Sequence, residues 1–310
     1  MNKIRSSVSV IIITIDRPIS LLQTIDSLLQ NTILPREIVV VDSANSKRTA
    51  EKVRRYGEQY RCAHLIRYIG IPNKGKSFAI NHGIRSSSGA FIARIDDDER
   101  ADRDWIKSIL RAFRDNPKAA AVTGPVIPSS LGNYWHRVWN EIVKDSYGKI
   151  GKASFIFGNN AAFKRGIFSR LNLYYDERMQ YVTGEDTYVA YALEMNGQTI
   201  IQDYRMKVFH DYRVSLKDFF SQWFQYGEGD YYLWVLHPDI LRWLHGEKET
   251  KLTLILLIRC ALKNLSHWRS SPSYALLWFG LAIKEIAYFI GVMSGYIRVA
   301  IDYKGIEPSR

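Results

Sequence analysis

Four consecutive acids follow an apolar run in this sequence. They are Asp96, Asp97, Asp98 and Glu99. Like charges this close repel one another unless a cation lies among them, and carboxylate oxygens suit Mg²⁺ or Mn²⁺, which also bind phosphates. The alternative is a solvated acidic turn that caps the helix expected to start near Asp104.

A second pair of acids opens a later helix-like segment. Glu185 and Asp186 follow Thr183-Gly184, and a helical pattern continues through Asn196. A carboxylate at a helix start usually caps the helix, but it can also act as a general base that takes a proton from a hydroxyl. His210 ends a strand-like segment; a lone histidine is usually structural, although neutral imidazole can ligate a metal.

Glycine and basic residues meet before another predicted helix, in the run Asn73-Lys74-Gly75-Lys76. A helix N-terminus with such neighbours favours an anion, although an ordinary loop-to-helix turn looks the same. Asn81 lies inside that helix, and Gly158-Asn159-Asn160 forms a polar run farther along the chain.

The elements that must position these residues alternate between strand and helix over the first 120 residues. The expected strands are 8–14, 37–41, 64–69, 90–95 and 119–126, and the expected helices are 20–30, 49–61, 77–86 and 105–115. This order predicts an α/β fold with a mostly parallel sheet, in which ligands bind beyond the carboxyl ends of the strands. Thr14, Asp16, Asp42 and Asp96 all lie at such ends, so we expect them to meet at one edge.

Beyond this region the pattern changes twice. It loosens into loops from about 127 to 165, and strand-like segments return at 199–201 and 206–209. The sharpest shift of composition lies near residue 215. We therefore expect a catalytic domain over 1–213 and a helical, aromatic-rich region over 214–310.

Composition and charge narrow the class of protein. The chain has 310 residues, 46% hydrophobic and 24% charged, which excludes a wholly disordered, collagen-like or coiled-coil protein. A net charge of +12 favours an anionic partner, which could be nucleic acid, a phosphorylated small molecule or a membrane surface. Cys62 and Cys260 match no zinc or redox spacing and are interpreted as buried hydrophobic residues.

Two apolar regions bear on localisation. The run 8–15 follows Lys3 and Arg5 but is β-branched, has no cleavage site and ends at Asp16, so it predicts a buried strand and a chain that stays in the cytosol. The C-terminal stretches 252–258, 274–283 and 286–293 are each shorter than the ~20 residues that span a bilayer.

The composition of that C-terminal region favours the membrane interface. Between positions 252 and 300 the sequence has a single acidic residue, Glu285. The basic residues of the same region are Arg259, Lys263, Arg269, Lys284 and Arg298. Basic, aromatic-rich helices commonly lie at a membrane surface, so we expect a peripheral position on the cytoplasmic face. Packing against the catalytic domain, homo-oligomer formation and true spanning are the alternatives. The spacing Gly291-x-x-x-Gly295 would let two helices approach closely.

Taken in order, these motifs resemble the family 2 glycosyltransferases of the GT-A fold. The resemblance covers about residues 6 to 213 and depends on six motifs in sequence: Thr14-Ile15-Asp16-Arg17-Pro18, Val41-Asp42, the run 73–83, Asp96-Asp97-Asp98, Gly158-Asn159-Asn160 and Gly184-Glu185-Asp186. Many members carry an acid pair followed by Gly-Ser after the second strand, whereas here Asp42 is followed by Ser43-Ala44-Asn45.

The resemblance implies a role for each matching residue. Those on the nucleotide-sugar side are Thr14, Asp16, Arg17, Asp42, Lys76, Asn81, Asp96, Asp97, Asn159 and Asn160. Asp98, Asp96 and His210 would hold the metal, either Mn²⁺ or Mg²⁺. Asp186 would be the catalytic base, with Glu185 beside it.

The implied reaction is an inverting, metal-dependent transfer of one sugar from a UDP-, GDP- or dTDP-sugar to a glycan or polyprenyl-linked acceptor in surface glycan synthesis. Two other classes remain. A sugar-phosphate nucleotidyltransferase also pairs such a sheet with acidic ligands, but it usually has a glycine-rich loop after the first strand, which this chain lacks. A nucleic-acid-binding protein is favoured only by the +12 charge.

Overall fold

The computed structural model of the chain describes residues 4–179, 183–212, 215–245 and 273–302. The chain forms two compact units. The first comprises Met1–Ser129, Asn140–Tyr181 and Glu185–Asp211, and the second comprises Ser130–Trp139, Val182–Gly184 and Tyr212–Arg310. The apolar stretch 252–258, with Cys260 just after it, lies outside the described residues, whereas Cys62 is buried as expected.

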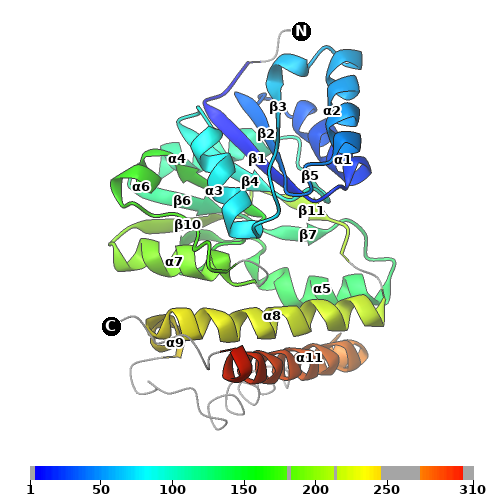
Figure 1. The fold of residues 1–310 in the computed structure, drawn as a ribbon, viewed down its shortest axis with the longest axis vertical. Coiled ribbons are helices and arrows are strands. Elements are labelled where there is room, and N and C mark those ends of the chain that lie inside the picture. Colours follow the sequence, from blue (N-terminus) through cyan, green and yellow to red (C-terminus); the bar gives the residue numbers. More distant parts are fainter. Residues whose placement is uncertain (1–3, 180–182, 213–214, 246–272, 303–310) are drawn as a thin grey trace. The chain divides into compact units, whose positions relative to one another are not determined.

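An eight-stranded sheet forms the centre of the first unit, in the order β3-β2-β1-β4-β9-β6-β10-β8 (Figure 1). Its strands are β1 (Val8–Thr14), β2 (Glu37–Asp42), β3 (Ile66–Gly70), β4 (Phe91–Ile95), β6 (Ala119–Thr123), β8 (Ile150–Ala153), β9 (Asn160–Lys164) and β10 (Thr199–Asp203). The pairs β1–β2, β1–β4, β2–β3 and β6–β10 are parallel. The α/β fold with a mostly parallel sheet is therefore confirmed.

The register of the sheet aligns the ends of its strands. Thr14 at the end of β1 lies opposite Asp42 at the end of β2. β9 runs antiparallel between β4 and β6, so Asn160 at its start lies opposite Ile95 at the end of β4. The carboxyl ends of β1, β2, β4, β6 and β10 consequently share one edge with the beginning of β9.

Helices cover both faces of this sheet (Figure 1). They are α1 (Pro18–Leu29), α2 (Lys47–Gln59), α3 (Lys76–Ser86), α4 (Trp105–Asp115), α6 (Gly166–Arg170) and α7 (Glu185–Met195), with short 3₁₀ turns η1 (Ala63–Leu65) and η2 (Lys144–Ser146). Alternate residues of β2 divide between two cores because successive strand side chains point to opposite faces. Ile38 and Val40 pack with α1 and α4, whereas Val39 and Val41 pack with Ala79 of α3.

A second, three-stranded sheet corrects one of our expectations. It consists of β5 (Glu99–Ala101), β11 (Val208–His210) and β7 (Val126–Pro128). The single strand predicted over 119–126 is wrong, because it breaks at Gly124-Pro125 into β6 and β7 of different sheets. A side chain on Gly124 would overlap the Met206 carbonyl, so the turn requires glycine there.

The predicted loop region 127–165 is also more regular than expected. It contains α5 (Tyr134–Val143), η2, β8 and β9. Although β9 has only five residues, it is almost wholly buried, and β8 is a partly exposed edge strand. Short strands of this kind carry too little alternation to be recognised from their sequence.

The second unit is helical. It contains the first part of α5, together with α8 (Leu216–Leu236), α9 (Pro238–His245) and α11 (Ser273–Asp302). Helices α8 and α11 lie side by side and run parallel (Figure 1). Gly227 of α8 packs against the Tyr288 backbone, and Gly291 of α11 packs against the Phe224 backbone. Small residues thus let the two backbones approach closely, as the Gly291/Gly295 spacing predicts.

Paired polar groups lie along α8 and α11. The Tyr288 hydroxyl donates to Asp230 Oδ2 over 2.6 Å, and Glu228 Oε1 contacts Ser294 Oγ and Arg298 Nε, each over 3.1 Å. Lys284 Nζ lies 2.6 Å from Glu285 Oε1, so the two central charges of α11 are paired within a continuous helix.

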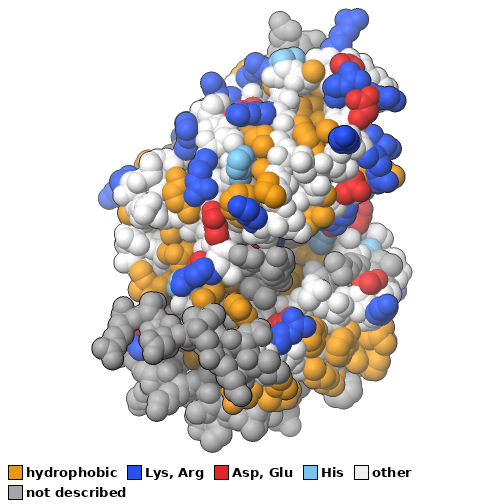
Figure 2. All heavy atoms as spheres, in the orientation of Figure 1, with side chains coloured by type: hydrophobic (Ala, Val, Ile, Leu, Met, Phe, Trp, Pro, Cys, Tyr) orange, Lys and Arg blue, Asp and Glu red, His pale blue; other side chains and the backbone are white. Residues whose placement is uncertain are grey.

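One described helix is long and apolar enough to cross a bilayer. The window Phe279–Val299 of α11 has a mean hydropathy of 1.2, and 39% of it is buried. Its most exposed apolar side chains are Phe279, Ile286, Ile290, Tyr296 and Ile297. Figure 2 shows hydrophobic side chains gathered over the part of the surface where α8 and α11 lie.

Candidate active site

Asp186 lies in the first turn of α7 and faces a buried arginine. Its Oδ1 atom is 2.8 Å from Arg94 Nη1. On its other side, the carboxylate lies against the backbone of Gly158, where any side chain would overlap it. Burial and the adjacent Glu185 charge raise the pKa of Asp186 to about 6, although Arg94 and Lys76 oppose the rise.

Arg94 belongs to β4 and is only 1% exposed. Its Nη1 atom also donates to the Tyr175 hydroxyl over 2.9 Å, and its guanidinium lies 5.0 Å from the centre of the Tyr175 ring. Within the described part of the chain, its second terminal nitrogen, Nη2, has no hydrogen-bond partner. Arg94 is not among the residues expected from the sequence, although a charged residue in the apolar strand Phe91–Ile95 is a visible signal.

Glu185 pairs with the basic residue that begins α3. Lys76 Nζ lies 2.7 Å from Glu185 Oε1, and Gly75 adopts a φ of 91° just before the helix. Burial opposes ionisation of Glu185, but Lys76 and Arg94 hold its pKa below the ordinary value. The structure therefore brings together Lys76, Glu185 and Asp186, and their roles in catalysis and donor binding stay predictions.

Asp98 and His210 meet at the other end of the candidate site. His210 Nε2 on β11 lies 3.5 Å from Asp98 Oδ1, and Arg17 Nη1 donates to Asp98 Oδ2 over 3.0 Å. Burial opposes ionisation of Asp98, but the hydrogen bond and charge of His210, together with Arg17, hold its pKa well below the usual range. The Asp98 carboxylate is therefore ionised at neutral pH and lies next to an imidazole.

Asp97 points into the protein. Its carboxylate accepts hydrogen bonds from Thr14 Oγ1 at 2.5 Å and Arg17 Nε at 3.1 Å, and Arg17 Nη2 pairs with its other oxygen. Burial raises the pKa of Asp97 to about 6 despite these contacts. Thr14, Arg17 and Asp97 thus form one inward-facing cluster that ties β1 to the acidic run.

Glu99 is also inward-facing. One of its oxygens accepts from the Asn159 side chain, and the other accepts from the Asp96 backbone N–H over 3.0 Å. Burial, with the Asp96 charge, raises the pKa of Glu99 well above its usual range. Of the four consecutive acids, two are therefore turned inward by the fold.

Asp16, which follows β1, and Asp42, which ends β2, hold the adjoining loops through hydrogen bonds. Asp16 adopts a φ of 47°, and its Oδ1 accepts from Ser46 Oγ at 2.6 Å and Thr49 Oγ1 at 2.9 Å. Those hydrogen bonds lower the pKa of Asp16. Asp42 is fully buried and accepts from the Tyr68 hydroxyl over 2.7 Å, besides the backbone N–H groups of Asp16, Ala44 and Ser46.

Asn81 and Asn160 hold separate segments together. Asn160 donates to the carbonyls of Pro125 and Met206 and accepts from Trp105 Nε1. Asn81 donates to the Tyr175 carbonyl over 2.8 Å and accepts from the Tyr175 N–H over 2.9 Å. Both amides use their hydrogens within the fold, so their predicted contact with a nucleotide sugar stays a prediction.

A divalent cation was predicted on Asp98, Asp96 and His210. In the described residues, no three His, Cys, Asp or Glu side chains converge closely enough to hold a metal ion by themselves. Asp98 and His210 nevertheless provide one carboxylate and one imidazole within 3.5 Å of each other. This donor set fits Mn²⁺ or Mg²⁺, which takes few protein ligands when substrate phosphates complete its coordination.

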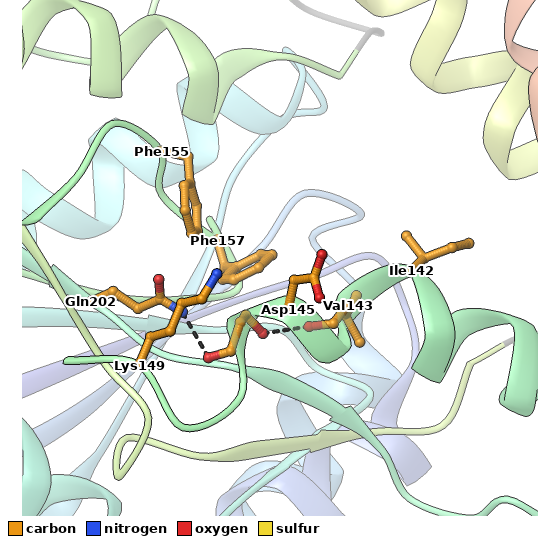
Figure 3. Close-up of a pocket in the computed structure, with 8 residues that line it drawn as sticks. Ile142, Val143, Asp145, Lys149, Phe155, Phe157 and Gln202 are labelled. Atoms are coloured by element: carbon orange, nitrogen blue, oxygen red, sulfur yellow. Dashed lines mark hydrogen bonds between the residues drawn. The ribbon is translucent and has the colours of Figure 1, made fainter. Parts of the chain in front are cut away.

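A pocket of about 340 Å³ lies beside η2 and β10 (Figure 3). It is lined by Ile142, Val143, Asp145, Ser146, Lys149, Phe155, Phe157 and Gln202. The rings of Phe155 and Phe157 meet edge to face at 5.1 Å, and Gln202 Nε2 donates to the Ser146 carbonyl over 2.8 Å. Phe157 directly precedes Gly158, whose backbone lies against the Asp186 carboxylate.

Two family models match the chain. The model of glycosyl transferase family 2 matches residues 9–171, and that of glycosyl transferase family group 2 matches residues 91–300. A curated relative, the glucosyl-dolichyl phosphate glucuronosyltransferase of Haloferax volcanii, is 25% identical over 94% of this chain and 95% of its own length. The poly-beta-1,6-N-acetyl-D-glucosamine synthase of Staphylococcus epidermidis is 28% identical over 56% of this chain and 42% of its own length.

Two solved structures share the fold. The mannosyltransferase PcManGT from Pyrobaculum calidifontis, in complex with GDP-Man and Mn²⁺, has a TM-score of 0.62 and 18% identity over 94% of this chain and 87% of that chain. GalNAc-T7 with UDP, GalNAc and Mn²⁺ has a TM-score of 0.55 and 18% identity over 67% of this chain and 43% of that chain.

Proposed function

Because the chain belongs to glycosyl transferase family 2, we propose that it moves one sugar from a nucleoside-diphosphate sugar to an acceptor hydroxyl, with inversion at the anomeric carbon. The observation that carries this proposal is the position of Asp186. Its carboxylate lies at the carboxyl edge of the sheet, next to Arg94 and Gly158, and a pKa near 6 leaves it mostly ionised at neutral pH.

The proposed chemical step is a single displacement. The acceptor oxygen attacks the anomeric carbon, and its proton passes to the Asp186 carboxylate. A new carbon–oxygen bond forms, while the bond between the anomeric carbon and the diphosphate oxygen breaks and its electron pair leaves with the nucleoside diphosphate. General-base assistance of this kind contributes ~10²–10⁴-fold to the rate.

Residues at the other end of the site would bind the donor. Asp98 and His210 would hold a divalent cation, with Asp96 beside them, and a bound cation supplies positive charge that balances the departing diphosphate. Arg17 and Lys76 add fixed positive charge, although each pairs with a carboxylate. Two structural neighbours were solved with Mn²⁺ and a nucleotide or nucleotide sugar, which supports a divalent cation and a nucleotide donor here.

For the acceptor we propose a polyprenyl-linked glycan. A relative that matches nearly the full length is a glucosyl-dolichyl phosphate glucuronosyltransferase, whose name states a lipid-linked acceptor. The pocket lined by Phe155 and Phe157 offers aromatic rings and the Lys149 side chain for such an acceptor. We further propose that the exposed apolar side chains of α11 rest on the cytoplasmic face of the membrane.

Thermal unfolding with UDP, GDP, dTDP or CDP, each with Mn²⁺ or with EDTA, tests this proposal. A ligand that binds only the folded state stabilises it by RT ln(1 + [L]/Kd), ~2.7 kcal/mol at a hundredfold excess over Kd. We expect one nucleotide to raise the Tm with Mn²⁺ and to lose that effect in EDTA. If none of them shifts the Tm, the acidic edge is not a donor site and the proposal fails.

A further inference from the structure

We infer that Arg94 is a positioning residue for the proton-accepting carboxylate, and that it acts as a fixed cation which aims Asp186 and keeps it ionised. This inference rests on the proposed function, because it takes Asp186 as the general base. Arg94 itself is too deeply buried to touch a substrate, so its effect must pass through the carboxylate.

The location of Arg94 makes it rigid. It lies in β4, where its backbone pairs with Ile11 of β1 on one side and with Ala161 of β9 on the other. A central strand with both neighbours in place cannot shift without breaking the sheet. The guanidinium is therefore delivered to Asp186 by a part of the fold that holds its place.

Two neighbours restrict the carboxylate. Arg94 Nη1 lies 2.8 Å from Asp186 Oδ1, and the Gly158 backbone lies so close to the same carboxylate that no side chain fits between them. Arg94 contributes a charge, and Gly158 contributes a steric limit. Together they restrict the direction in which the free lone pairs of Asp186 point, which is what a general base requires.

The arginine is itself oriented by a chain of contacts. Tyr175 receives a hydrogen bond from Arg94 and presents its ring to the guanidinium. Asn81 on α3 in turn fixes Tyr175 by two hydrogen bonds to its backbone. The buried Asn81 side chain, which the sequence assigned to the nucleotide sugar, thus has a second interpretation as the far end of this chain.

Three charged groups act on the charge of Asp186. Arg94 on β4 and Lys76 on α3 favour the ionised form, and Glu185 on α7 disfavours it. Burial raises the pKa of Tyr175 to about 12, so its hydroxyl is neutral. Lys76 is 2.7 Å from Glu185, so it chiefly neutralises that residue. Arg94 is therefore the direct partner of Asp186, and because a guanidinium does not lose its proton, that support persists at every working pH.

The test compares Arg94→Gln and Arg94→Lys with the wild-type chain. We expect Arg94→Gln to lower kcat ~10–100-fold with the donor KM within about threefold, and to move the acid limb of the pH–rate profile up by about one pH unit or more. Arg94→Lys keeps a charge but loses the planar guanidinium, so it should recover part of both effects. Tyr175→Phe keeps the ring and removes one hydrogen bond, and we expect a smaller shift in the same direction.

Arg205→Gln is the matched control. Arg205 also pairs with a buried carboxylate, that of Asp203 on β10, at a distance of 2.8 Å from Nε to Oδ1. Its loss should cost stability without moving the acid limb. An acid limb that stays within about 0.3 pH unit of wild type in Arg94→Gln, or one that moves equally in Arg205→Gln, overturns the inference.

A second measurement keeps this inference separate from the proposed function. Infrared titration of the carboxyl band that Asp186→Asn removes reports the protonation of that side chain without any substrate. We expect its midpoint to rise in Arg94→Gln and to stay in Arg205→Gln. An unchanged midpoint in Arg94→Gln overturns the role of Arg94. If instead the midpoint shifts in Arg94→Gln but the Asp186→Asn variant keeps its full transfer rate, the assignment of Asp186 as the base is overturned. If Arg94→Gln does not fold, Arg94→Lys and Tyr175→Phe provide the same comparison.

Discussion

Asp186 and Asp98 are carboxylates at the same edge of one sheet, yet their surroundings shift their pKa values in opposite directions. Asp186 is held by a buried arginine and lies beside another acid, and its pKa is raised to about 6. Asp98 lies between His210 and the half-exposed Arg17, and its pKa is held well below the ordinary value. One carboxylate is thus suited to receive a proton, and the other stays an anion that attracts a cation.

The difference comes from the balance of charge at each place. At Asp186, burial is accompanied by an adjacent like charge from Glu185. At Asp98, burial is offset by two positive or hydrogen-bonding partners from different strands and loops. Both residues are aspartates, so the residue type does not determine which one acts as a base and which one binds a metal. The neighbouring groups determine these roles, as they do for paired carboxylates in other enzymes.

Removing the base should have the largest effect. We expect Asp186→Asn to keep the metal-dependent rise in Tm with the donor nucleotide and to lose transfer by ~10²–10⁴-fold, because it removes the proton acceptor and leaves the donor side unchanged. Rates of sugar transfer and nucleotide-induced Tm shifts, measured on the same preparation, check this. Transfer within a few-fold of wild type would show that another group takes the proton.

Displacing the Asp186 carboxylate should lower the transfer rate somewhat less than removing it. An added methyl in Gly158→Ala would occupy the place of the Asp186 carboxylate, so the side chain must move. A shift of about 1 Å in a reacting group costs roughly 10²-fold in rate, and we expect a loss of that order in kcat.

Gly166→Ala provides the control for this change, because open space surrounds that position. Transfer rates and unfolding temperatures of both variants separate a local displacement from a general loss of stability. If Gly158→Ala keeps its rate, the contact between Gly158 and Asp186 has no part in catalysis.

The two ends of the site also differ in how far the sequence predicted them. Acids after a strand, and acids at a helix start, are visible as motifs because their spacing follows the elements that carry them. The sequence singled out Lys76, Glu185, Asp186, Asp98 and His210, and in the structure Lys76 pairs with Glu185, beside Asp186, whereas Asp98 lies next to His210.

Arg94 and Tyr175 were missed because their importance depends on which strands become neighbours. The antiparallel strand β9 was hidden in a predicted loop, since five buried residues show no period, and with it the backbone of Gly158 and its contact with Asp186. Polar residues that serve the fold also resemble polar residues that bind ligands. Asn160 joins three segments through its amide, and no spacing in the sequence distinguishes that from contact with a sugar.

Of the changes at Asp186, Gly158 and Asp98, we expect the substitution of Asp98, the proposed metal ligand, to have the smallest effect. Asp98→Ala removes the carboxylate that lies 3.5 Å from His210, so we expect a weaker metal-dependent binding of the nucleoside diphosphate by about tenfold or more, equivalent to ~1.4 kcal/mol. Titration of Mn²⁺ at a fixed nucleotide concentration, followed by the rise in Tm, measures this change. Because Asp186 and its partners are unaltered, the acid limb of the remaining activity should stay in place. An unchanged Mn²⁺ dependence would show that Asp98 does not bind the metal. The two carboxylates would then differ only in the direction of their pKa shifts.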